Sequence, residues 1–384
     1  INRCQAPTLG ALAIKGAYHL RSDQPVTVYQ FNPLDYTLPG APDGNSLSND
    51  ASLLLPSNAW RNEYLVASYP VLTNGFVFWP SLMAVTAYQD GTEVTITTRS
   101  NTPAAGGALA FIARVPQTLT LNSGDVLELA AINGSGDLTG SLVTSNKPVE
   151  VFGGHYCAYV PDINSPYCDH MEESMFPTDA LSTHYVVVAP AVTTIPDGKE
   201  EMVRIIATQP NTTLEYDPPV VGAPVMIANA GDFVEIARNS QSFALTASAK
   251  VLVAQYMEGS TVAGDIGDPS MSLAVPVEQF RSQYLFHAPT NYETNCVAII
   301  ASATASVTLD GQLIGNFQPI GNSGFSLARV TPLSNGPLNN GNHSIPGSEP
   351  FGIQVYGYGE DTSYWYPGGL DLHPVPIGRE MSRF

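Results

Sequence analysis

"SNDASLLLPSNAWRNEYLVASYP", residues 48–70, decides the fold because the chain repeats its pattern twice. The second copy is "MEESMFPTDALSTHYVVVAP", residues 171–190, and the third is "DPSMSLAVPVEQFRSQYLFHAP", residues 268–289. Each copy has an apolar run, a proline and a tyrosine eight residues after the proline. These pairs are Pro56 and Tyr64, Pro177 and Tyr185, and Pro276 and Tyr284. The spacing predicts a strand that ends at the proline, a short turn, and a strand that opens with the tyrosine.

A second phrase closes each repeat. It reads "TSNKPVEVFGGHY" at residues 144–156, "TASAKVLVAQYM" at 246–257 and "SEPFGIQVYGYG" at 348–359. The repeats therefore measure roughly 100 to 120 residues, which is the size of a β-sandwich domain. The N-terminal "LRSDQPVTVYQFN", residues 20–32, is a closing phrase without its opening. We expect strands of a truncated or shared unit in residues 1–45, sandwiches in 46–160, 161–262 and 263–372, and a tail in 373–384.

Alternation of apolar and polar residues dominates the chain between the repeated phrases. Examples are "PVTVYQF" at residues 25–31, "TEVTITT" at 92–98 and "QTLTLNSGDVLELA" at 117–130. Each is bounded by glycine, proline, asparagine or aspartate, as half-buried antiparallel strands are. We find no amphipathic helix. The sequence predicts an all-β protein in which three antiparallel β-sandwich units of immunoglobulin-like size stand in a row, rigidly packed through short connections.

Composition and charge exclude several classes of protein. Hydrophobic residues make up 44% and charged residues 13% of the chain, so it is not a disordered one. The formal net charge is -19, with 15 Lys plus Arg, which argues against nucleic-acid partners. No apolar run is long enough to insert into a membrane. Scarce lysine and an even number of cysteines favour an extracellular or cell-surface location, in a secreted protein.

Two cysteines lie between two histidines in the order His155, Cys157, Cys168, His170. These residue types could bind zinc, act as a redox pair, or staple a loop. The spacing matches no usual zinc knuckle, so we expect a Cys157–Cys168 disulfide worth about 3 kcal/mol at the crossover between the first and second sandwiches. Either Cys4 and Cys296 pair with each other, tying the N-terminal strands to the third unit, or Cys4 has lost its partner with the front part of a truncated unit.

Acidic residues next to these cysteines raise the question of a metal. Asp169, His170, Glu172 and Glu173, together with His155, could form a cation site or an acid–base cluster. The alternative, which we favour, is that His170 and one carboxylate hydrogen-bond the loop backbone, while the remaining carboxylates are solvated. The loop "PDGNSLSND", residues 42–50, could hold calcium, but it departs from the EF-hand pattern at Ser48 and Leu54. We therefore expect no cofactor, with calcium as the alternative.

Five aromatic residues near the C-terminus are candidates for ligand binding. They are Tyr356, Tyr358, Tyr364, Trp365 and Tyr366. Exposed aromatic side chains beside glycine and acidic residues are typical of protein or carbohydrate recognition. Alternation along a strand would turn some of them inward, so packing is the other interpretation.

Several phrases resemble a known family. They are "FGGHYCAYV" at residues 152–160, "CDHMEESMFPTDALSTHYVVV" at 168–188, "GDVLELA" at 124–130, "VTLDGQLIG" at 307–315 and "VYGYGEDTSYWYPGG" at 355–369. They are similar to the N-terminal domain of the IgGFc-binding protein family. "YQFNPLDYTLPG", residues 29–40, is closer to the bacterial branch. The resemblance implies a non-catalytic extracellular module associated with mucus, adhesion and, in the namesake, immunoglobulin Fc binding.

These observations together predict a recognition or adhesion module of a larger extracellular protein. It would bind a protein or glycan through loops at the sandwich ends and through the aromatic strand. The sequence shows no catalytic fingerprint, so we expect no enzyme activity. One alternative is a structural subunit or spacer that self-associates through strand edges. Another is a metal-dependent hydrolase that uses residues 155–173.

Overall fold

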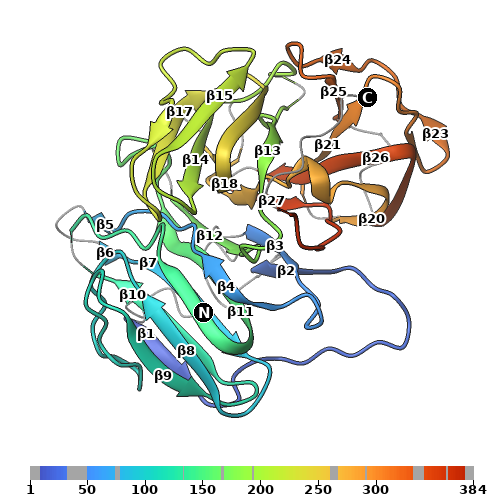
Figure 1. Ribbon diagram of the computed structural model, residues 1–384. Helices are drawn as coiled ribbons and strands as arrows, with labels where there is room; N and C mark the ends of the chain where they lie inside the picture. Colours follow the sequence, from blue (N-terminus) through green and yellow to red (C-terminus); the bar gives the residue numbers. More distant parts are fainter. Residues whose placement is uncertain are drawn as a thin grey trace, which may run out of the picture.

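The alternating stretches form antiparallel strands in a computed structural model of the chain (Figure 1). It describes residues 9–32, 50–73, 78–132, 134–165, 168–192, 194–259, 267–289, 292–331, 341–359 and 362–376. In β7 (Ser81–Ala87) buried and half-buried residues alternate along the whole strand, as a period of two requires. Within the described residues the only helical element is the short 3₁₀ helix η1 (Val277–Gln279). The predicted all-β fold is confirmed.

Unit 1 is an eight-stranded sheet that folds over on itself at one long strand, β11 (Leu142–Ala158). The first part of β11 pairs with β4 and β8, and the second part pairs with β7 and β12. Its other strands are β1 (Gly10–Ala13), β4 (Arg61–Leu65), β7, β8 (Thr92–Thr97), β9 (Gln117–Leu121), β10 (Val126–Ala131) and β12 (Asp169–Ser174). The small pair β5 (Leu72–Thr73) and β6 (Phe78–Trp79) lies beside it. Val94 of β8 and Val85 of β7, whose strands pair with opposite parts of β11, belong to one hydrophobic cluster, so the two halves form a sandwich.

Unit 2 repeats this plan around β18 (Phe243–Met257). The first part of β18 pairs with β13 and β15, and the second part pairs with β14 and β19. The strands are β13 (Ser182–Val187), β14 (Glu201–Ala207), β15 (Thr212–Asp217), β16 (Met226–Ile227), β17 (Phe233–Asn239), β18 and β19 (Met271–Leu273).

Unit 3 repeats it again around β26 (Gly341–Gly359). The first part of β26 pairs with β20, and the second part pairs with β21 and β27. The strands are β20 (Arg281–Ala288), β21 (Thr294–Ser302), β22 (Thr308–Leu309), β23 (Gln312–Leu313), β24 (Gln318–Pro319), β25 (Phe325–Val330), β26 and β27 (Thr362–Pro367). The three sequence repeats are thus three copies of one strand arrangement.

Four short strands meet at the centre of the molecule. Each pairs antiparallel with the strand that comes immediately before it in the chain. The pairs are β3 (Asp50–Leu54) with β2 (Val28–Asn32), β12 with β11, β19 with β18, and β27 with β26. β3 contacts β12 and β27, and β19 contacts the same two strands. The expected domain boundaries at residues 160 and 262 fall between strands that pair with each other.

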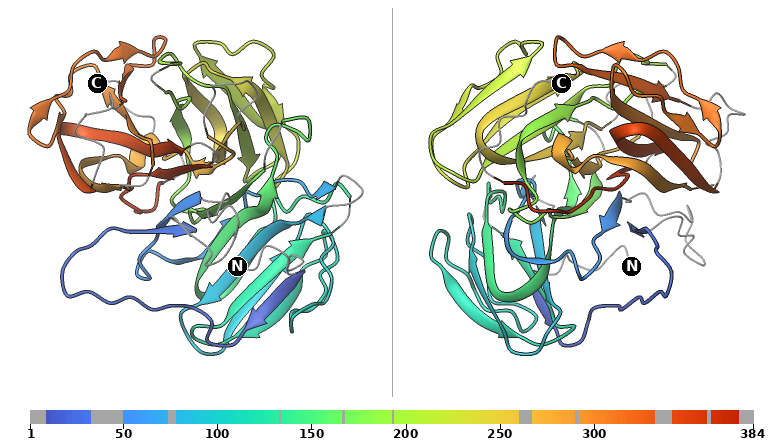
Figure 2. Two further views of the ribbon diagram at one scale, coloured as in Figure 1. Left: turned by 180° about the vertical axis from the view of Figure 1, so that it is seen from behind. Right: turned by 45° about the vertical axis from the view of Figure 1, so that its right-hand side comes forward.

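The three units lie at the corners of a triangle around these central strands (Figure 2). The expected row of sandwiches is therefore wrong. A row would leave the first and third repeats apart, whereas β3, which lies in the first repeat, contacts β27 of unit 3 here. The largest hydrophobic cluster contains residues from all three units, for example Val151, Leu252 and Ile300. Shared burial of apolar surface favours the triangle over the row.

The N-terminal segment joins two units instead of forming a sandwich of its own. β1 pairs with β10 at the edge of unit 1, and β2 pairs with β3. From β2, the Tyr29 ring packs on Tyr366 of unit 3 with 4.3 Å between ring centroids. The Phe31 ring meets Tyr364 at 5.5 Å. The β2–β3 hairpin therefore closes the triangle against unit 3.

Candidate functional site

The predicted Cys157–Cys168 disulfide is present and closes the loop between β11 and β12, with 5.1 Å between the two Cα atoms. The loop also contacts unit 2, because the N–H of Gly259 donates to the carbonyl of Val160 at 3.1 Å. A zinc site built on these two cysteines is wrong, since Zn²⁺ needs free thiolates and the two sulfurs are bonded to each other. The stretch that carries the family phrase is a staple.

Of the other two cysteines, the structure describes Cys296 but not Cys4. Cys296 is buried on β21, and burial raises the pKa of its thiol. Cys4 lies outside the described residues, so a Cys4–Cys296 bond stays a prediction.

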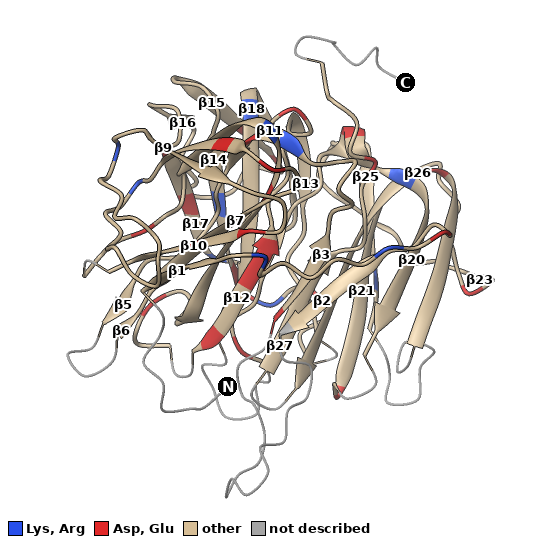
Figure 3. Cartoon of the chain, turned by 90° about the horizontal axis from the view of Figure 1, so that it is seen from below, with Lys and Arg blue, Asp and Glu red and all other residues tan. Residues whose placement is uncertain are grey.

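The acidic residues after Cys168 fall on β12 (Figure 3). Alternation along this strand places them on opposite faces. Asp169 and Glu173 are buried, and Glu173 Oε1 accepts a hydrogen bond from the Ser52 hydroxyl at 2.8 Å. His170 and Glu172 lie on the other face of the strand, with 3.4 Å between His170 Nε2 and Glu172 Oε2. The strand therefore divides the expected cluster into two pairs, and the expectation of solvated carboxylates is wrong for Asp169 and Glu173, which are buried.

His155 is buried on β11, and its side chain hydrogen-bonds a backbone N–H. Its Nδ1 accepts the N–H of Cys157 at 3.1 Å, and burial lowers the pKa of the imidazole to about 3. Among the residues that the structure describes, no three His, Cys, Asp or Glu side chains are grouped to hold a metal ion. Most of the calcium candidate, residues 42–49, lies outside those residues and stays a prediction.

The five C-terminal aromatic residues are all buried, so the expectation of an exposed binding strip is corrected. Tyr356, Tyr358, Tyr364, Trp365 and Tyr366 are each 0% exposed.

Both faces of this strand pair are covered by other parts of the molecule. On one side the Tyr356 hydroxyl accepts the N–H of Ala191, in unit 2, at 3.0 Å. On the other side Tyr364 and Tyr366 pack under the β2–β3 hairpin. The sequence indicates alternation within one sheet, but it does not reveal that a second unit covers the outer face. Packing is therefore their role.

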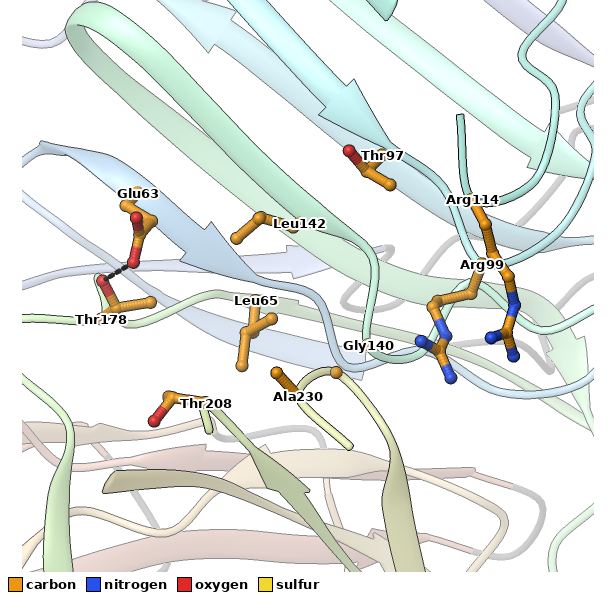
Figure 4. A pocket seen from close by; sticks show the side chains of 11 residues that line it. Glu63, Leu65, Thr97, Arg99, Arg114, Gly140, Leu142, Thr178, Thr208 and Ala230 are labelled. Carbon is orange, nitrogen blue, oxygen red and sulfur yellow. Dashed lines mark hydrogen bonds between the residues drawn. The ribbon is translucent and has the colours of Figure 1, made fainter. Parts of the chain in front are cut away.

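A cleft of about 280 Å³ lies between units 1 and 2 (Figure 4). Its lining residues are Glu63, Leu65, Thr97, Arg99, Arg114, Gly140, Leu142, Thr178, Thr208, Ala230 and Gly231. The two units meet backbone to backbone at the glycines. A Cβ atom added to Gly140, which has φ +80°, would lie 1.8 Å from the carbonyl oxygen of Gly231. Only glycine permits this approach.

Charged groups stand at both ends of the cleft. At one end the guanidinium groups of Arg99 and Arg114 lie side by side (Figure 4), and Arg99 forms an ion pair with Asp232 of unit 2. At the other end Glu63 Oε1 accepts the hydroxyl of Thr178 at 2.9 Å. Burial disfavours the ionised form of Asp232, but hydrogen bonds from Asn229 and Arg99 and the charges of both arginines outweigh it and lower its pKa.

Beside the cleft, a buried arginine from unit 2 reaches into unit 1. Arg204 Nη1 donates to Asp137 Oδ2 and to the carbonyl of Ser68, both at 2.8 Å. Its guanidinium also lies 4.7 Å from the ring centroids of Tyr69 and Phe233. Breaking a buried charge network of this kind is strongly destabilising, so it holds the cleft walls in a fixed relation.

Sequence reasoning missed the cleft, because its residues come from distant parts of the chain. Arg99 and Asp232 are separated by 133 positions. The one available signal was that arginine and lysine are scarce, at 15 in the whole chain, which makes Arg99 and Arg114 unusual.

Comparison with known proteins shows which family the chain belongs to. The family model described as IgGFc binding protein matches residues 50–357, which includes every residue that lines the cleft. The chain belongs to the IgGFc-binding protein family. The resemblance expected from the sequence phrases is confirmed.

A human member of the family shows how similar this chain is to a known protein and how much of that protein it covers. The chain is 26% identical over 340 residues to the IgGFc-binding protein of Homo sapiens, which covers 85% of this chain. It spans 6% of the length of that human protein. Within the described part of the chain, no helix has the length and apolarity needed to cross a membrane.

Proposed function

We propose that this chain is a non-catalytic recognition module of an extracellular protein, and that it binds a protein ligand in the cleft between units 1 and 2. The observation that carries the proposal is the cleft itself, a concave site of about 280 Å³ whose walls come from two rigidly joined units. Ligand sites occur preferentially at such domain junctions. Family membership supports a binding role over a catalytic one.

An extracellular location is part of the proposal. A disulfide such as Cys157–Cys168 persists in an oxidising compartment and is rare in the cytosol. An acidic chain of net charge -19 also suits a soluble partner better than an anionic membrane or nucleic acid.

The test is a binding measurement by biolayer interferometry with immunoglobulin G Fc as the first probe, because the human relative is named for it. Ala230→Trp would fill the cleft from its exposed rim. Val221→Trp, at a position that is 98% exposed and outside the cleft, is the matched control. We expect saturable Fc binding that weakens at least about tenfold in the first variant and is unchanged in the second.

Two results would overturn the proposal. One is Fc binding that Ala230→Trp leaves intact, since the ligand would then bind elsewhere. The other is no saturable Fc binding together with binding to a glycan array, or with self-association in analytical ultracentrifugation. The glycan result would favour carbohydrate recognition, and self-association would favour the structural spacer.

A further inference from the structure

The Arg99–Arg114 end of the cleft is a cationic spot on an acidic molecule. The chain has 34 Asp plus Glu against 15 Lys plus Arg, so the molecule as a whole repels anions. Two guanidinium groups nevertheless lie together at one end of a concave site (Figure 4). Like charges that repel each other are stabilised when an anion binds between them.

The charges at this end do not balance. Arg99 is 20% exposed and forms an ion pair with Asp232, whose second carboxylate oxygen accepts Asn229 Nδ2 at 2.7 Å. Arg114 is exposed, and within the described residues no carboxylate lies at ion-pair distance from it. Two guanidinium groups thus share one carboxylate, and one positive charge remains. The remaining carboxylate of the cleft, Glu63, is at the far end, beside Thr178.

The backbone fixes Arg114 where it stands. Its φ is +63°, a conformation that costs a non-glycine residue about 1–2 kcal/mol. Its N–H donates to the carbonyl of Thr98 at 2.7 Å, and the turn is closed by the N–H of Val115 donating to the carbonyl of Ile112 at 3.1 Å. Ile112 and Val115 are 61% and 45% exposed, so the turn offers apolar side chains on either side of Arg114. Exposed apolar residues around a charged group are typical of protein interaction sites.

The lining suggests what kind of ligand fits. Beyond the arginines, the walls are aliphatic and hydroxyl-bearing, with Leu65, Leu142 and Thr97 among them, and the lining residues include no aromatic ring. Sugar recognition usually uses such rings as a flat apolar platform. An aliphatic stem that ends in a carboxylate, as in glutamate, fits this lining better. Arginine also binds carboxylates through two parallel hydrogen bonds.

We propose that the Arg99–Arg114 end of the cleft binds a carboxylate from an acidic, apolar-flanked segment of the protein ligand. This inference rests on the proposed function and names the chemistry that the ligand must carry. Arg114 would contact the carboxylate directly, while Arg99, held by Asp232, would complete the site. The apolar neighbours of the acidic residue would contact Ile112 and Val115 on the rim.

The test uses a capped synthetic peptide of alternating leucine, valine and glutamate, and a second peptide in which glutamine replaces each glutamate. Affinities are measured by fluorescence anisotropy at low and high salt on the whole chain. We expect the glutamate peptide to bind at least about tenfold more tightly than the glutamine peptide. Arg114→Gln should remove at least about tenfold of that affinity and most of its salt dependence. Arg21→Gln, which removes the same charge from an exposed residue outside the cleft, should change neither.

Equal binding of the two peptides, or full affinity in Arg114→Gln, would overturn the inference. So would binding of a sialylated oligosaccharide in place of the peptide, because the carboxylate would then come from a glycan. The unfolding midpoint of Arg114→Gln is measured alongside to show that the variant is folded. If Ala230→Trp blocks Fc while both peptides fail to bind, this inference fails and the proposed function stands. If Fc fails to bind as well and the chain instead binds a glycan array or self-associates, the proposed function itself is rejected.

Discussion

Three tyrosines explain why the sequence repeats are spaced as they are. Tyr64, Tyr185 and Tyr284 are each the fourth residue of their strand, in β4, β13 and β20. Each hydroxyl accepts the N–H of the first residue of that strand and donates to a carbonyl of the long strand of the same unit. The pairs of partners are Arg61 and Val149, Ser182 and Val251, and Arg281 and Phe351. One side chain thus satisfies two backbone groups where the sandwich halves join.

Replacing one of these hydroxyls should therefore be costly. We expect Tyr64→Phe to lower the free energy of unfolding by about 1 to 3 kcal/mol, because it leaves the half-buried N–H of Arg61 and the buried carbonyl of Val149 without that partner. Chemical denaturation monitored by fluorescence measures the change. Tyr88→Phe removes the same atom from a residue that is 45% exposed and should have little effect. A similar loss in both variants would contradict this account of the repeat.

At the scale of elements, the hairpins β2–β3, β11–β12, β18–β19 and β26–β27 carry the chain through the centre of the molecule. Each places its short strand against the short strands of other units. Among the described residues, β11–β12 is the hairpin whose connection is closed by a disulfide.

Removing the staple tests its contribution to stability. We expect the double variant Cys157→Ser, Cys168→Ser to lose about 3 kcal/mol of unfolding free energy, because the unfolded chain regains the entropy of the open loop. The thermal unfolding midpoint, measured with and without a reducing agent, follows this loss. The reducing agent should lower the midpoint of the native chain and leave that of the double variant unchanged. An equal response in both would show that the staple does not stabilise the fold.

At the scale of the whole molecule, the contacts between units decide both the rigidity of the triangle and the existence of the cleft. Units 1 and 2 are joined by Arg204, by the Arg99–Asp232 ion pair, and by the approach of Gly140 to Gly231. The triangle is closed on the other side where the β2–β3 hairpin packs on unit 3.

Gly140→Ala tests whether the close approach of the two units is required. The added Cβ would overlap the Gly231 carbonyl, so units 1 and 2 must move apart, and we expect a loss about 1–3 kcal/mol larger than that of a matched control. Gly324→Ala is that control. Gly324 has φ +81°, close to the +80° of Gly140, and no atom within 4 Å of the added Cβ, so its cost is the backbone strain of about 1–2 kcal/mol alone. Differential scanning calorimetry compares the two variants, and equal midpoints would argue against a tight junction.

The sequence by itself determined the strands, the three repeats, the proline–tyrosine spacing and the Cys157–Cys168 staple. These features are local or recur at a fixed period, so hydrophobic alternation and repeated phrases report them directly. The sequence phrases also gave the resemblance to the IgGFc-binding protein family, which the match of the family model confirms.

Only the tertiary structure decided how the units pack on one another. Alternation tells which face of a strand is buried inside its own sandwich, but it is silent about a second unit that covers the outer face. For that reason the row of sandwiches and the exposed aromatic strip were wrong: Tyr356 packs on unit 2, and Tyr366 packs under the N-terminal hairpin. The cleft is hidden from the sequence for the same reason, since Arg99 and Asp232 meet across 133 positions through packing that no local pattern records.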